Sequence, residues 1–79
     1  MVEKYKISKQ YAIGDLVINL FPLELFDGCK IKEDSIGLVV GIVGPSLHLD
    51  GYDYMVLING REIFFFEKEL SLFKKGEDK

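Results

Sequence analysis

The residues best suited to nucleophilic chemistry lie together in one short segment. Ser46, His48 and Asp50 carry the hydroxyl, imidazole and carboxylate of a hydrolytic triad, and His48 is the only histidine among the 79 residues. A triad needs its base within hydrogen-bond reach of the nucleophile, and a spacing of two residues in a loop does not provide that geometry. We therefore expect an exposed loop histidine, no catalytic residues and no enzyme, unless a partner supplies the missing groups.

Acidic side chains form two groups that could surround a cation. Asp27, Glu33 and Asp34 lie in one segment, and Asp50 and Asp53 lie in another. Neighbouring loops could bring them around a hard metal ion, which prefers oxygen ligands. The spacing of a calcium-binding loop is absent, however, and one cysteine with one histidine cannot supply four zinc ligands. We expect solvated acidic loops without a metal or cofactor, and a basic protein partner is the alternative.

The charge of the chain argues against nucleic acid as the partner. The net charge is −3 and the pI about 5.0, which removes the general attraction to phosphate that supplies most non-specific binding. Tyr52, Tyr54 and the run of phenylalanines at 64–66 could stack on bases, but no group of basic residues lies among them. Core packing or a protein interface explains these aromatic residues better.

Nothing in the sequence predicts a membrane or secreted protein. No apolar run approaches the ~18 residues that a bilayer span needs, and the start, MVEKYKISKQ, lacks the apolar middle of a secretion signal. The single cysteine, Cys29, cannot form an internal disulfide and is expected to be a free thiol in a reducing compartment. We expect a cytoplasmic location without membrane contact.

Short β-branched and aromatic runs, separated by glycine, proline and acidic residues, predict one small all-β domain. The expected strands cover residues 15–20, 36–43, 52–58, 61–66 and 70–73, with a tight turn at 67–69. Residues 1–13 form an N-terminal arm with a candidate extra strand, 14–73 the domain, and 74–79 a charged flexible tail. The long loop 21–35 is expected to fold over the domain, and Gly37 and Gly41 to mark a bulge or close backbone contact within their strand.

Asn59-Gly60 is the strongest local signal, because this pair favours a two-residue type I′ turn between antiparallel strands. The resulting register places Val56 opposite Ile63 and Tyr54 opposite Phe65 on one face, with Ile58 opposite Arg61. Leu57 opposite Glu62 and Met55 opposite Phe64 lie on the other. Both faces are largely apolar, so the second must be covered by the long loop, the N-terminal arm or a partner.

The order of these elements, from about Gly14 to Phe73, is that of a five-stranded SH3-like barrel with an N-terminal arm and one long loop. Gly14-Asp15-Leu16-Val17, the stretch 36–41, the hairpin around Asn59-Gly60 and the closing Phe66 with Leu70 resemble small SH3-like proteins of tailed bacteriophages. The resemblance implies a component or accessory of a virion, located in the particle or in the infected cell. The chain lacks the tryptophan that many of these proteins carry on the fourth strand, so no site is carried over through it.

We therefore predict a non-catalytic protein-binding or assembly module, which associates with itself or within a larger assembly. The predicted contact residues are the large apolar side chains of the long loop and of the second hairpin face: Leu23, Leu25, Phe26, Met55, Leu57, Phe64 and Phe66. The alternative is a small regulatory protein that binds nucleic acid or a host enzyme through the same domain.

Overall fold

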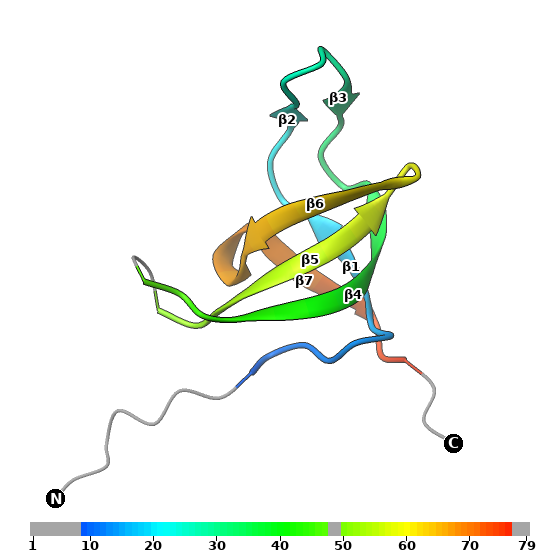
Figure 1. The fold of residues 1–79 in the computed structure, drawn as a ribbon. Helices are drawn as coiled ribbons and strands as arrows, with labels where there is room; N and C mark the ends of the chain where they lie inside the picture. Colours follow the sequence, from blue (N-terminus) through cyan, green and yellow to red (C-terminus); the bar gives the residue numbers. More distant parts are fainter. Residues whose placement is uncertain (1–8, 48–49, 77–79) are drawn as a thin grey trace, which may run out of the picture.

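The computed structural model describes residues 9–47 and 50–76, which form seven β-strands and one turn of 3-10 helix (Figure 1). The elements are β1 (Leu16–Asn19), β2 (Leu23–Glu24), β3 (Lys30–Ile31), β4 (Ile36–Pro45), β5 (Tyr52–Ile58), β6 (Arg61–Phe66), η1 (Glu67–Glu69) and β7 (Leu70–Lys74). The prediction of an all-β chain is confirmed. Each of the five predicted strands matches one observed strand, and η1 takes the place of the predicted tight turn.

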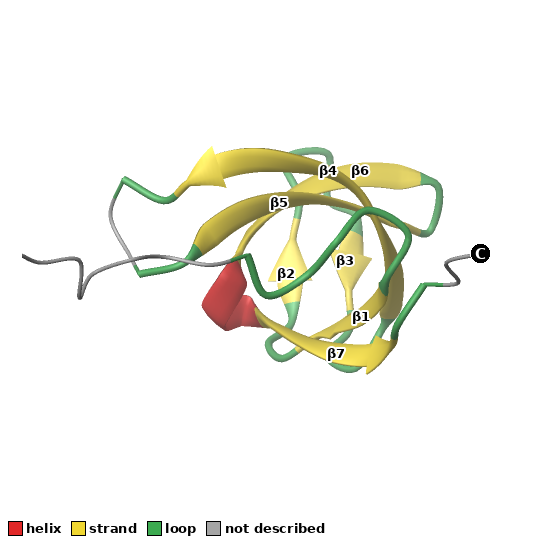
Figure 2. Ribbon diagram, turned by 90° about the horizontal axis from the view of Figure 1, so that it is seen from below, coloured by secondary structure: helices red, strands yellow, loops and turns green. Residues whose placement is uncertain are grey.

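Five strands form one antiparallel sheet in the order β6-β5-β4-β1-β7, and β2 pairs with β3 in a separate hairpin. The sheet curves strongly, so that its strands surround a common interior (Figure 2). β6 and β7 are its two edges, and within the described chain no strand pairing joins them. The structure thus shows a curved five-stranded antiparallel sheet with two open edges and a separate two-stranded hairpin.

The glycines of β4 let this strand bend and pack closely, as expected. The pairing of β4 with β5 shifts register between Val39 and Gly41, which marks an irregularity of the β-bulge kind. A Cβ atom on Gly37 would lie 2.5 Å from side-chain carbons of both Val56 and Ile58. Glycine is therefore needed at Gly37 because the buried side chains of β5 occupy that space.

The β5–β6 hairpin has the predicted register. Val56 pairs with Ile63, Tyr54 with Phe65 and Met55 with Phe64, and Ile58 and Arg61 flank the turn. Asn59 and Gly60 have φ angles of 52° and 77°, as a type I′ turn requires. The inner face of this hairpin supplies most of the hydrophobic core, which consists of Val17, Ile31, Val39, Tyr54, Val56, Ile58, Ile63, Phe65 and Leu70.

The long loop packs against the core at Leu23 and Leu25, as expected, whereas Phe26, which was expected to cover the domain with them, is exposed. Leu23 and Leu25 pack against the core, and Asn19 fixes the loop by donating from Nδ2 to the carbonyls of Phe21 and Lys32, each at 2.9 Å. The tip is the β2–β3 hairpin, which projects from the sheet (Figure 1) and leaves Phe26 fully exposed. Ile31 of β3 is itself a core residue, so the hairpin is anchored in the core and carries Phe26 into solvent at its turn.

Both ends of the domain are tied to the sheet by buried polar groups. The hydroxyl of Tyr54 accepts hydrogen bonds from the backbone N–H groups of Gln10 (3.0 Å) and Tyr11 (3.2 Å). Asp15 accepts from the backbone N–H groups of Ala12 (3.0 Å) and Gly76 (2.8 Å). The described part of the predicted arm, residues 9–13, adds no strand, and residues 1–8 lie outside the described residues.

Candidate protein-docking surface

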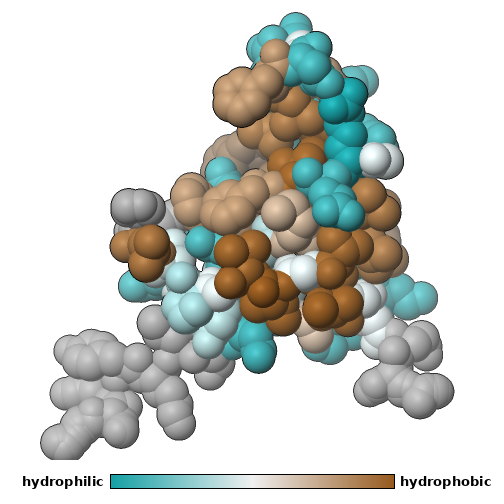
Figure 3. All heavy atoms as spheres, in the orientation of Figure 1, coloured by the Kyte–Doolittle hydropathy of each residue, from teal (hydrophilic) through white to brown (hydrophobic). Residues whose placement is uncertain are grey.

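The predicted apolar surface lies on the side of β5 and β6 that points away from the core. We use "outer face" for Met55, Leu57, Phe64 and Phe66, which alternate along the two strands with the buried core residues. Phe64 keeps 45% of its surface exposed, and the other three are partly buried. Apolar atoms also gather over this side of the molecule in Figure 3. The described arm and the β2–β3 hairpin thus leave the outer face partly open to solvent.

Phe64 and Phe66 form a pair on this face. Their rings lie edge to face, with centroids 5.4 Å apart and an interplanar angle of 84°. They meet because residues two apart in a strand point to the same side of the sheet. Such a pair is a rigid apolar feature with little conformational entropy to lose on binding, since its rings already support each other.

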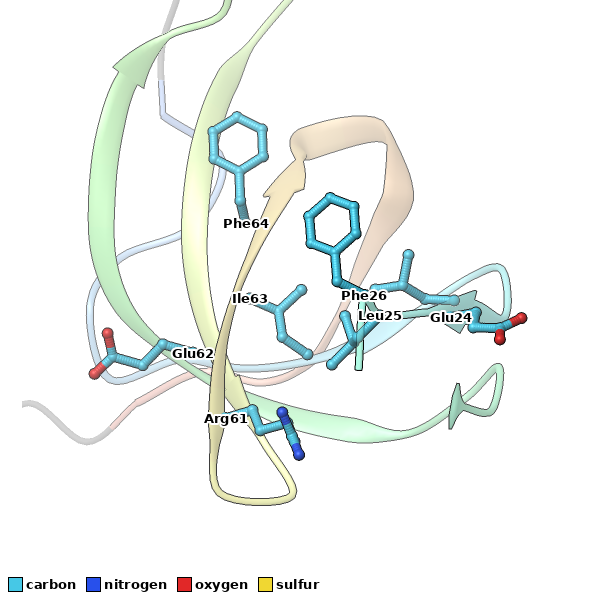
Figure 4. A pocket seen from close by; sticks show the side chains of 8 residues that line it. Glu24, Leu25, Phe26, Arg61, Glu62, Ile63 and Phe64 are labelled. Atoms are coloured by element: carbon cyan, nitrogen blue, oxygen red, sulfur yellow. The ribbon is translucent and has the colours of Figure 1, made fainter. Parts of the chain in front are cut away.

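A cleft of about 390 Å³ lies between the β2–β3 hairpin and β6 (Figure 4). Four of the seven predicted contact residues line it, together with charged residues of both elements. The lining residues are Leu23, Glu24, Leu25, Phe26, Arg61, Glu62, Ile63 and Phe64. The structure therefore brings the predicted loop residues next to Phe64, although they are about 40 positions apart in the sequence.

An ion pair between Arg61 and Asp27 connects the hairpin tip to the start of β6, and half of each side chain stays exposed. The carboxylate of Asp27 also accepts a hydrogen bond from the backbone N–H of Cys29 at 3.1 Å. That N–H, followed by the Arg61 guanidinium, holds the pKa of Asp27 below its usual 3.8. Arg61 was not among the predicted site residues, because nothing local to its turn indicates that Asp27 lies beside it.

A second hollow, of about 610 Å³, lies where β4 ends beside β5 and β6. Its lining residues are Val43, Gly44, Pro45, Leu47, Asp53, Phe64 and Phe66, and we call it the Asp53 groove. Phe64 and Phe66 are the predicted residues in it, while Met55 and Leu57 line neither hollow. Leu47, 90% exposed, and Val43, 56% exposed, were missed. The only available signal was their apolar character on either side of Gly44-Pro45.

Three polar side chains are buried among the described residues: Asp15, Asn19 and Asp53. The backbone N–H of Gly76 is the main cause that lowers the pKa of Asp15 below 3.8, with further contributions from the N–H of Ala12 and from Lys75. Asn19 uses its oxygen as well as its nitrogen, since Oδ1 accepts from the backbone N–H of Ser35 at 2.8 Å. These two residues hold loops and chain ends in place through their hydrogen bonds. Asp53 differs from both because its Oδ1 has no hydrogen-bond partner among the described residues.

A tyrosine pair lies at the opposite side of the sheet, in the core. Tyr11 and Tyr54 meet edge to face at 5.3 Å, and burial, followed by the charge of Glu67, raises the pKa of Tyr11. Burial is also the main cause that raises the pKa of Tyr54, whose hydroxyl donates to Glu67 Oε1 at 3.4 Å. Both hydroxyls keep their protons at neutral pH, so this network binds the arm to the sheet.

The triad and the metal site that were considered from the sequence are not seen among the described residues. His48, the central residue of the considered triad, lies outside the described residues. Across residues 9–47 and 50–76, no three His, Cys, Asp or Glu side chains come together in a way that could hold a metal ion. The same residues contain no helix with the length and apolar character that crossing a membrane requires. Cys29 is a partly buried free thiol beside the core.

Comparison of the chain with protein-family models, with curated proteins and with solved structures finds no match. The resemblance to small phage proteins rests on the order of the strands and on the hairpin turn, and it stays a prediction.

Proposed function

We propose that this chain is a non-catalytic module that docks onto other protein chains through its outer face and the adjoining hairpin cleft. The observation that carries the proposal is the exposed apolar surface next to a complete core. Phe64 on the outer face and Phe26 in the turn of the β2–β3 hairpin are open to solvent. The inner face of the β5–β6 hairpin already supplies most of the core without them. Aromatic residues, phenylalanine among them, are enriched at protein interfaces relative to the rest of the surface.

The continuity of the exposed apolar surface supports docking over an accidental exposure. Single exposed apolar residues are normal, but contiguous patches on small soluble domains mark interaction sites. Here the outer face continues into the Asp53 groove on one side and into the hairpin cleft on the other, with Phe64 common to both hollows. A partner that covers Phe64 would therefore also contact the walls of both hollows.

The edge of the sheet offers a further means of attachment. β6 is an edge strand, and within the described chain no strand pairs with its outer side. Free N–H and C=O groups on such an edge can bind an extended segment as an added strand, while its side chains enter neighbouring pockets. The hairpin cleft borders this edge at residues 61–64, so a partner segment would find both kinds of contact at one place.

We further propose that the curved sheet belongs to the SH3-like barrels and acts in a phage particle or infected cell. The order β6-β5-β4-β1-β7 supports the barrel, because it places the first and last strands of the domain side by side. The virion setting is supported by the sequence resemblance alone. Repeated copies in a particle would suit a module that docks on protein chains.

The test compares two residues of the outer face with an exposed phenylalanine elsewhere on the sheet. The double variant Leu57→Gln/Phe64→Gln should stay folded and lose association, whereas Phe73→Gln on β7, where Phe73 is 55% exposed, should associate like the wild type. Molar mass by light scattering over a concentration series reports association, and circular dichroism reports folding. Unfolding of the double variant would place these residues in the core and contradict the proposal. So would a wild-type chain that stays monomeric and binds neither peptide of the experiment described below.

A further inference from the structure

Asp53 occupies an unusual position in the sheet. It alternates with the inward-pointing Tyr54 on β5 and therefore belongs to the outer side, where it pairs with Phe66 of β6 and Gly44 of β4. Its neighbours there are apolar, and yet only 8% of Asp53 is exposed. A carboxylate in such surroundings is expensive to bury unless hydrogen bonds or an opposite charge compensate for the lost water.

The compensation is missing for one oxygen. Among the residues that the structure describes, Asp53 Oδ1 is buried and has no hydrogen-bond partner. Asp15, the other buried aspartate, accepts two backbone hydrogen bonds and lies 3.5 Å from Lys75 Nζ. A buried polar atom left without a partner destabilises the fold, and such an atom in a native protein calls for an explanation. An incoming donor that completes its hydrogen bonding would be one.

Asp53 also lines an open groove, from which a donor could approach its carboxylate. The Asp53 groove, at about 610 Å³, lies within the ~300–1,000 Å³ typical of ligand sites. Phe64 and Phe66 line it from β6, and Val43, Pro45 and Leu47 line it from the end of β4. Gly44, which pairs with Asp53, has φ 142° and contributes no side chain to the groove.

We propose that the Asp53 groove binds an arginine side chain that a partner protein presents between apolar residues. This inference rests on the proposed function and names the chemistry of the partner. The guanidinium would donate to the Asp53 carboxylate, and the flanking apolar side chains would pack against Val43, Leu47 and the two phenylalanines. The groove thereby adds a specific contact to the otherwise non-directional apolar face.

Arginine suits this groove better than lysine or an anion. The guanidinium is planar and weakly hydrated, presents a fork of N–H donors to a carboxylate, and stacks on aromatic rings such as those of Phe64 and Phe66. The ammonium of lysine is strongly hydrated and has no flat face. Phosphate and other anions are repelled by Asp53 and by the net charge of −3, which favours a basic partner as a whole.

The experiment uses two short peptides, acetyl-Leu-Arg-Leu-amide and the same peptide with citrulline, the neutral isostere of arginine. Each is titrated into the full-length chain labelled with nitrogen-15, and the amide shifts of Gly44, Asp53 and Phe66 report binding at the groove. We expect a Kd roughly tenfold lower for the arginine peptide, because hydrogen bonds to a charged group contribute about 1.5–3 kcal/mol. Added salt should reduce this preference.

Two variants with the same loss of charge locate the effect. Asp53→Asn should reduce the tenfold preference to about onefold while the spectrum keeps the dispersion of a folded chain. Asp50→Asn removes an exposed carboxylate three residues away and should leave the preference intact. Because Asn keeps the size of Asp, a change in affinity limited to Asp53→Asn would come from the carboxylate and not from repacking.

Each outcome decides the matter. A preference for arginine that persists in Asp53→Asn, or shifts confined to residues far from the groove, would overturn the inference. Equal binding of both peptides at the outer face would overturn it as well, while the proposed function would stand. Binding of neither peptide by a monomeric chain would contradict both. A molar mass that rises with concentration in the wild type and not in Asp53→Asn would identify a second copy as the occupant, against the separate partner proposed here.

Discussion

The two faces of the β5–β6 hairpin carry similar residues in different surroundings. On the inner face Val56 and Phe65 are almost completely buried, whereas on the outer face Phe64 keeps 45% of its surface exposed. Both faces belong to the same two strands and follow from the same register. The difference arises because the sheet curves around its inner face, while the outer face has only partial cover from the rest of the described chain. Apolar content therefore marks where burial is favourable, and sheet curvature decides which face becomes the core.

The buried aspartates show the same contrast in polar form. Asp15 accepts backbone hydrogen bonds from two separate segments, and Asp53 has a buried oxygen without a partner among the described residues. A satisfied carboxylate adds to stability, and an unsatisfied one subtracts from it. The structure thus gives these two aspartates opposite roles, one that holds the fold together and one that suits a ligand.

Removing one ring from each face gives the largest expected difference. Phe65→Ala should lose about 3–5 kcal/mol, which equals the whole stability of a core this small and leaves the chain unfolded. Phe64→Ala should lose roughly 1 kcal/mol, because only about half of its surface is buried. Circular dichroism shows whether each variant folds, and urea unfolding measures the loss of stability in any variant that does. Equal losses would mean that the outer face is part of the core after all.

Adding a methyl group at a glycine of β4 compares the space available on the core side of the sheet with that on the outer side. Gly37→Ala would force a Cβ to within 2.5 Å of buried Val56 and Ile58 and should cost about 1–3 kcal/mol. In Gly41→Ala the nearest neighbour is Met55 Cβ at 3.5 Å, an ordinary contact, so stability should stay within ~0.5 kcal/mol. Midpoints of thermal unfolding compare the two variants. A harmless Gly37→Ala would show that the core has room that the structure does not display.

The pH dependence of stability tests the satisfied aspartate. The pKa of Asp15 lies below its usual 3.8 in the folded chain, so its contribution is present above that value and is lost as the pH falls through the folded pKa. Asp15→Asn replaces one acceptor by an amide that faces an N–H donor, and should cost about 1–3 kcal/mol at neutral pH. Unfolding measured at neutral pH and at about pH 3 should show a smaller acid-induced loss in the variant. An unchanged acid-induced loss would contradict this role of Asp15.

Local patterns predicted the strands and the β5–β6 register well. Asn59-Gly60 determines its turn by the φ angles that these residues tolerate, and the register follows from the turn. The path of the long loop could not be predicted in the same way, because it depends on Asn19 meeting Lys32 and on Arg61 meeting Asp27 across the fold. The sequence could show Phe26 as apolar, but its exposure depends on these distant contacts.

The Asp53 groove was harder to foresee for a related reason. Asp53 lies within the predicted strand 52–58, but an aspartate between two tyrosines gives no local sign that it is buried. Its burial follows from its pairing with Gly44 and Phe66, which needs the bulged end of β4 to be in place. Irregular pairing of this kind has no reliable local signal, so the acidic group of the site was assigned to solvent.

The smallest expected effect is also the sharpest test of the contrast between the two aspartates. Asp53→Asn replaces a buried carboxylate, one oxygen of which has no partner among the described residues, by a neutral amide that costs less to bury. Unfolding in urea should therefore show equal stability or a gain of up to ~1 kcal/mol. Most substitutions of buried residues destabilise, which makes the sign informative even though the size is small. Asp50→Asn, at an exposed site, provides the baseline. A loss as large as that of Asp15→Asn would mean that Asp53 supports the fold. A gain would mean that the chain retains a destabilising charge beside an open apolar groove. Such a loss of stability is expected at a binding site, where the same charge contributes to affinity for the ligand.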